Sequence, residues 1–117
     1  MLKSSYKVDN NNKYESEDYI MKEFNQVKDK NMDRLEQYVP IVDRVHGSHH
    51  PEFHHVRRVF EELNHKVKAA GVDKPNLDSE FKELREVTSN YAVPGDVCES
   101  YEAVYKMLSE LDEAYQG

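Results

Sequence analysis

Hydrophobic residues recur every three or four positions along most of the chain, which is the spacing of one buried helix face. Ser16 followed by Glu17 and Asp18 suits a helix start, because acidic side chains are favoured at the positive end of the helix dipole. The pattern predicts a first helix from Ser16 to about His46. Its stripe comprises Ile20, Phe24, Val27, Leu35, Tyr38, Val42 and Val45.

Proline and glycine mark the limits of this helix and the start of the next. Pro40 is expected to bend the first helix or to break its hydrogen-bond ladder near Glu36. Gly47 is expected to form a left-handed C-terminal cap. Pro51 suits the first turn of a second helix, where a backbone N–H has no intrahelical partner to lose.

Three further helices are predicted after Pro51. The second ends at Gly71, and its stripe comprises Phe53, Val56, Phe60, Leu63, Val67 and Ala70. The third carries Leu77, Phe81, Leu84, Val87 and Tyr91. The fourth carries Val97, Tyr101, Val104, Leu108, Leu111 and Tyr115. Asp96 with Glu99 resembles a capping box at the start of the fourth helix.

Four helices with short connections predict an all-α, up-down antiparallel four-helix bundle. The turn between His46 and His55 and the loop from Tyr91 to Asp96 should then lie at the same end. Residues 1–15, which include KVDNNNK, offer little to bury and are expected to be a flexible tail. Residues 16–117 are expected to form a single domain.

The composition of the chain excludes several classes of binding partner. Lys and Arg number 16 against 23 Asp and Glu, for a net charge of −7. This balance argues against nucleic acid and anionic membrane surfaces, both of which need a clustered basic face. There is no apolar run long enough to cross a membrane and no signal-peptide core in the sequence, so we expect a cytoplasmic, soluble protein. Cys98 is the only cysteine, which excludes an internal disulfide.

Two segments carry a family resemblance. YVPIVDRVHGSHHPE (Tyr38 to Glu52) and, more distantly, LREVTSNYAVPGDVCESYEAVYKMLSEL (Leu84 to Leu111) resemble the hemerythrin-type HHE domain of the iron-sulfur cluster repair proteins. That resemblance covers roughly residues 20 to 116. It implies a hemerythrin-like bundle, a di-iron site of histidines and bridging carboxylates, and a role in nitrosative and oxidative stress.

The positions that the resemblance assigns to iron ligands hold other residues. A first-helix histidine is expected near Asn25, and a His-x-x-x-Glu pair near Ala70 and Lys74. Another histidine is expected within residues 75–78, and a last pair after Tyr115. We therefore expect a shortened member that lacks an intact metal site, either through a deletion near residues 72–75 with an early stop or through deliberate trimming.

Five of the six histidines lie in the turn after the first predicted helix. His46, His49, His50 and His54 are candidate ligands for a replacement zinc site, since a structural zinc takes about four converging ligands. Against such a site, only Glu52 offers a nearby carboxylate and no cysteine lies close in the sequence. The turn is otherwise expected to be a solvated loop whose histidines titrate near neutral pH.

Three functions remain open from the sequence. The first is a metal-free interaction or regulatory module, with no catalytic residues and no enzymatic activity. The second is a metal-binding repair or stress protein that completes its site through the histidines of the turn or by dimerisation. The third is a self-associating structural protein. A protein partner or homodimer would use the apolar stripe near Ile20, Phe24 and Val27, which is expected to lack partners within the chain.

Overall fold

The computed structural model describes residues 17–117, with side chains described from residue 23 onward. These residues form four helices: α1 (Glu17–His46), α2 (Glu52–Ala70), α3 (Asp78–Val87) and α4 (Glu99–Gln116). The described residues contain no strand. The predicted tail, residues 1–15, lies outside the described part.

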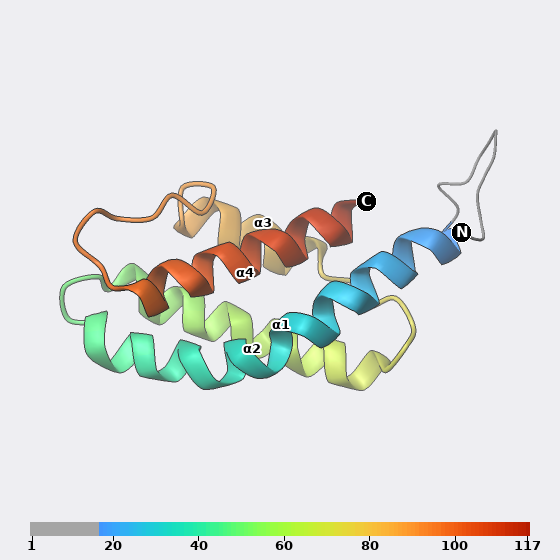
Figure 1. The fold of residues 1–117 in the computed structure, drawn as a ribbon, viewed down its shortest axis with the longest axis horizontal. Helices are drawn as coiled ribbons and strands as arrows, with labels where there is room; N and C mark the ends of the chain where they lie inside the picture. Colours follow the sequence, from blue (N-terminus) through green and yellow to red (C-terminus); the bar gives the residue numbers. More distant parts are fainter. Residues whose placement is uncertain (1–16) are drawn as a thin grey trace.

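Successive helices run in opposite directions, so the molecule is an all-α four-helix bundle (Figure 1). Helix α1 packs mainly against α4, and α2 packs against α3 and α1. The α1–α2 turn and the α3–α4 loop lie at one end of the bundle, as the sequence predicted (Figure 1). The α2–α3 connection lies toward the opposite end.

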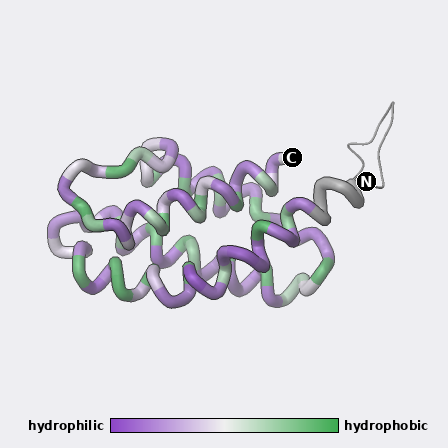
Figure 2. Tube along the Cα trace, viewed as in Figure 1, coloured by the Kyte–Doolittle hydropathy of each residue, from purple (hydrophilic) through white to green (hydrophobic). Residues whose placement is uncertain are grey.

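One hydrophobic core runs through the bundle. Hydrophobic and hydrophilic residues alternate along every helix (Figure 2), and the hydrophobic ones form a single buried cluster. All four helices contribute side chains to it, among them Leu35, Leu63, Phe81 and Leu108. Burial of these stripes is the main favourable contribution to folding. None of the described helices is both long enough and apolar enough to cross a membrane.

Proline and glycine act differently near the end of α1. Pro40 has no backbone N–H, so it interrupts the hydrogen-bond ladder as the sequence predicted, yet the helix continues to His46. Val39 and Val42 on either side of the proline are each 1% exposed, so packing holds the helix together despite the lost hydrogen bond. The expectation of a left-handed cap at Gly47 was wrong, because its φ is not positive. Glycine is needed there because a Cβ atom would approach the Asp43 carbonyl oxygen and the His54 ring to 2.5 Å.

The sequence predicted the connection before α3 correctly and the connection after α3 incorrectly. Gly71 ends α2 with φ of 62°, as predicted. Helix α3 ends at Val87, one turn earlier than expected, and Ser89, Asn90 and Tyr91 all adopt positive φ. The capping box at Asp96 was also wrong, because α4 begins after Cys98 and no side chain caps it.

Buried polar contacts hold this irregular segment. The Thr88 hydroxyl accepts a hydrogen bond from the Tyr91 N–H at 2.7 Å, and the Tyr91 hydroxyl donates to the Asp112 carboxylate at 2.8 Å. Arg85 donates to both oxygens of Asp112 at 2.7 and 2.8 Å. Left-handed backbone is costly for residues other than glycine, so these contacts must outweigh that cost.

Candidate functional site

His50 joins the α1–α2 turn to the α3–α4 loop. Its Nδ1 atom lies 3.0 Å from Oε2 of Glu52, and its Nε2 atom lies 3.0 Å from Oδ1 of Asp96. The side chain is only 14% exposed. The hydrogen bond to Glu52, with a further contribution from the negative charge of Asp96, raises the pKa of His50 despite the opposing effect of burial. The imidazolium form is favoured because only that form can donate to both carboxylates.

His46 lies beside His50 at the end of α1. Its Nε2 atom is 3.2 Å from the Sγ atom of Cys98. Both histidine rings contact the Tyr101 ring, at centroid distances of 5.5 Å for His46 and 5.6 Å for His50. Cys98 is distant from the turn in the sequence, but the fold brings it beside the turn, so a thiol does lie near these histidines.

Two buried tyrosines lie next to His46 and His50 at this end of the bundle. The hydroxyl oxygens of Tyr101 and Tyr105 lie 3.0 Å apart, and the Tyr101 hydroxyl lies 3.5 Å from Glu52. Burial is the main cause that raises the pKa of both tyrosines. Both hydroxyls thus stay protonated, and they serve as hydrogen-bond donors rather than as bases.

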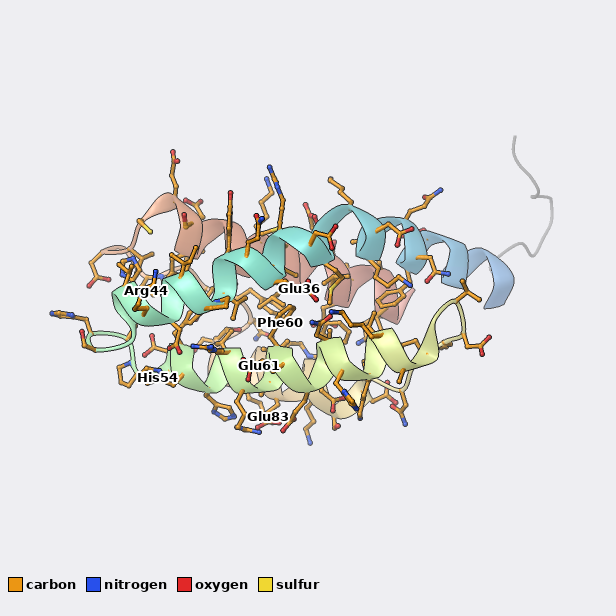
Figure 3. The ribbon with its side chains drawn as sticks, turned by 90° about the horizontal axis from the view of Figure 1, so that it is seen from below. Glu36, Arg44, His54, Phe60, Glu61 and Glu83 are labelled. Atoms are coloured by element: carbon orange, nitrogen blue, oxygen red, sulfur yellow. The ribbon has the colours of Figure 1, made fainter. Side chains whose placement is uncertain are left out.

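His49 and His54 contact other polar groups. His49 is bonded to the neighbouring Ser48 hydroxyl at 3.1 Å. His54 lies beside Asp43, whose other carboxylate oxygen accepts a hydrogen bond from Arg57 at 3.1 Å. Figure 3 shows His54 at the surface of the bundle and Phe60 in its interior.

His55 lies on the side of α2 that faces α3. It contacts Glu83 at 2.6 Å, and Glu83 also accepts a hydrogen bond from Arg58 at 2.7 Å. The hydrogen bond from His55, followed by the one from Arg58, lowers the pKa of Glu83. These partly exposed side chains link α2 to α3 at the surface of the bundle, where Figure 3 shows Glu83.

The four candidate zinc ligands do not converge. The rings of His46 and His50 are 6.4 Å apart, but each of the four histidines has a different polar partner. Within residues 23–117, no group of three or more His, Cys, Asp or Glu side chains is placed to hold a metal ion. The histidine side chains form separate hydrogen bonds and do not surround a common metal position.

Aromatic side chains fill the bundle interior at the end of α4. The Tyr115 ring packs between Phe24 and Phe81, with centroid distances of 5.9 and 5.2 Å. Its hydroxyl accepts a hydrogen bond from the Leu77 N–H at 2.9 Å and donates to Asp78 at 2.8 Å. Burial is the main cause that raises the pKa of Tyr115. We call Tyr115, Phe24 and Phe81 the aromatic plug.

The plug lies at the end of the bundle where the resemblance places iron ligands. Ala70 has no ligand atom in its side chain, and Lys74 lies over the Tyr115 ring, 5.6 Å from its centroid. The segment before α3 supplies a backbone N–H to Tyr115 rather than a histidine. Residues of this kind do not fit a di-iron centre, which requires several carboxylates and imidazoles.

The apolar stripe expected to be free on α1 is not free where side chains are described. Phe24 is 2% exposed because it packs on Tyr115, and Val27 is partly buried against the core. The side chain of Ile20 lies outside the described residues. Sequence reasoning placed Tyr115 in a helix stripe but missed that its hydroxyl ties α4 to the start of α3, since that contact spans 38 positions.

A surface hollow of about 360 Å³ lies beside Glu52, the hydrogen-bond partner of His50. It is formed by the α3–α4 loop and α4, and Val93 and Tyr105 also line it.

The chain was compared with known proteins. It matches no protein-family model, no curated protein and no solved structure.

Proposed function

We propose that this chain is a metal-free, hemerythrin-like helical bundle that acts as an interaction or regulatory module rather than as an enzyme. The observation that carries the proposal is the aromatic plug, because Tyr115 fills the interior where the resemblance calls for iron. A buried tyrosine bonded to the Leu77 backbone stabilises the closed bundle. Such a bundle offers its outer surface, rather than an internal centre, for function.

The histidine end supports the regulatory part of the proposal. His50 links two inter-helix segments that are 46 positions apart in sequence, and its hydrogen bond to Glu52 and the charge of Asp96 raise its pKa. A change in its protonation state alters a contact between two segments of the fold without any bound ligand. The same end therefore has the chemistry of a pH-responsive contact.

Elemental analysis of untagged protein tests the proposal. The full chain is incubated anaerobically with ferrous iron, exposed to air, desalted, and measured for iron per chain, visible absorption and thermal unfolding midpoint. We expect no retained iron, no oxo-bridge absorption and an unchanged midpoint, since a ligand that binds only the native state would raise it. Retention of close to two irons per chain would restore the ancestral di-iron chemistry and reject the proposal.

A further inference from the structure

One face of α1 combines exposed cations with exposed apolar side chains. Ile41 and Val45 are 45% and 59% exposed, although Ile and Val are among the residue types most often buried. Lys30, Arg34 and Arg44 are also exposed. Arg34, Ile41 and Arg44 follow Lys30 at steps of four, seven and three positions, and Val45 lies four positions after Ile41. All five residues therefore lie along one helix surface. We call this surface the α1 outer strip.

The three cations of the strip have no partner among the described residues, which distinguishes them from most cations of the bundle. Arg57, Arg58, Arg85, Lys66 and Lys68 all form ion pairs. Gln37, the exposed residue four positions before Ile41, is uncharged, and the acidic residue that borders the strip is Asp33. Even with Asp33 included, the strip carries a net positive charge in a protein whose overall charge is −7.

We infer that the α1 outer strip docks an acidic amphipathic segment of a partner protein; this rests on the proposed role of the chain as an interaction module. Ile41 and Val45 would contact the apolar face of that segment, and Arg34 and Arg44 would pair with its carboxylates. Exposed apolar residues bordered by charge are typical of docking surfaces for amphipathic helices. Charge complementarity then selects the partner and speeds the encounter.

Charge also favours an acidic segment over a second copy of the chain and over an anionic membrane. Pairing the strips of two copies would place Lys30, Arg34 and Arg44 near the same cations of the second chain, and like charges repel. An anionic membrane is an extended surface, so it would face more of a protein whose net charge is −7 than the strip alone. A short acidic segment meets mainly the local positive charge, because salt screens charges more than about 8 Å away.

The test uses the full, untagged chain and a displayed library of random peptides about 16 residues long, a length of four to five helical turns. Peptides are selected on the natural chain and counter-selected on the double variant Arg34→Glu/Arg44→Glu. We expect enrichment of acidic peptides with apolar residues three or four positions apart. Absence of enrichment, or enrichment of peptides without acidic residues, would overturn the inference.

Matched variants locate the binding surface. Fluorescence anisotropy of an enriched peptide should show at least about tenfold weaker binding to Arg34→Glu/Arg44→Glu. The control Lys82→Glu/Lys106→Glu makes the same charge change at exposed cations outside the strip and should change affinity by less than about twofold. Equal weakening by both variants would reject the strip as the site. Circular dichroism verifies that each variant is folded.

A second pair of variants tests the apolar contact. Ile41→Gln/Val45→Gln should weaken the enriched peptide by at least about tenfold, whereas Val72→Gln/Val93→Gln alters exposed valines elsewhere and should leave binding intact. If neither pair weakens binding, the strip is not an apolar docking surface. Such a failure in metal-free protein would reject this inference alone, whereas bound iron would reject the proposed function.

Two further outcomes would reassign the strip. Sedimentation with phosphatidylserine-containing vesicles that is lost in Arg34→Glu/Arg44→Glu would make it a membrane contact. A concentration-dependent dimer that dissociates in the same variant would make it a contact between copies. Either result overturns the assignment to an acidic protein segment.

Discussion

The Nε2 atom of His50 lies 3.0 Å from the Oδ1 atom of Asp96, so the α1–α2 turn and the loop before α4 are bonded to each other. The other ring nitrogen faces Glu52 at the same distance. A neutral imidazole carries one N–H and can donate to only one of these carboxylates. The bond between the two segments therefore depends on the charge of His50.

Stability should fall as the pH rises through the raised pKa of His50. Hydrogen bonding to Glu52 and the nearby charge of Asp96 raise that pKa in the folded chain, so the native state binds the proton more tightly than the unfolded state. The stabilisation is complete below the ordinary pKa of about 6.5 and is lost above the raised value. Urea unfolding midpoints measured between about pH 6 and pH 9 report this loss.

Substitution assigns the effect to His50. His50→Gln should remove most of the fall in midpoint across this range. His49→Gln should keep it, because the His49 side chain has a hydrogen bond only with the adjacent Ser48 among the described residues. A His50→Gln protein with the pH dependence of the natural chain would show that the contact with Asp96 does not contribute.

Replacing Gly47 with alanine should destabilise the chain although its φ is ordinary. The added Cβ atom would lie 2.5 Å from the Asp43 carbonyl oxygen and from the His54 ring, so backbone must shift. Overpacking of this kind costs about 1–3 kcal/mol of unfolding free energy. Gly95→Ala is the matched control, since nothing lies within 4 Å of the new atom there. Equal unfolding free energies for the two variants in urea would contradict the close approach.

Glycine at Ser89 should stabilise the α3–α4 loop. Ser89 has φ of 53°, a conformation that favours glycine, so Ser89→Gly should raise the unfolding free energy by up to about 1 kcal/mol. The same change at Ser109 lies inside α4 and should lower it by about 0.5 kcal/mol. Thermal unfolding followed by circular dichroism compares the two. A loss of stability at Ser89 would mean that the segment is not left-handed in solution.

Removing the Tyr115 hydroxyl should lower the unfolding free energy while the ring stays in the core. Tyr115→Phe keeps the ring between Phe24 and Phe81 but leaves the buried Leu77 N–H without its acceptor, at a cost of about 1–3 kcal/mol. Tyr38→Phe removes a hydroxyl with no hydrogen bond among the described residues and should cost little. Hydrogen exchange at the Leu77 amide should accelerate only in Tyr115→Phe.

The sequence predicted local structure well because helix periodicity is a local signal. The stripes through Phe53 and Tyr101, the first-turn position of Pro51 and the glycine that ends α2 all follow from neighbouring residues. Ser89 to Tyr91 could not be predicted, because their left-handed backbone depends on a hydrogen bond from Tyr91 to Asp112, which lies 21 positions away in α4.

The candidate site was predicted in part only. The histidines were identified, but which ones share a partner depends on how α4 is rotated about its axis, and periodicity does not specify that rotation. Asp96 and Cys98 reach the turn across 46 and 52 positions. The sequence also suggested a stripe without partners at Phe24, whereas the length of α4 brings Tyr115 to cover it.

The contact between His46 and Cys98 makes the histidine end accessible to spectroscopy. Cys98 is the only cysteine of the chain and is exposed, so a thiol-reactive fluorophore attaches at one position without mutation. A dye at that position lies beside His46, which packs on Tyr101 together with His50. Its emission would report changes at this end of the bundle during a pH titration. A second dye at the start of α1 would lie about 45 Å away along a 30-residue helix. Energy transfer between the two dyes would then follow the shape of the bundle during the same titration.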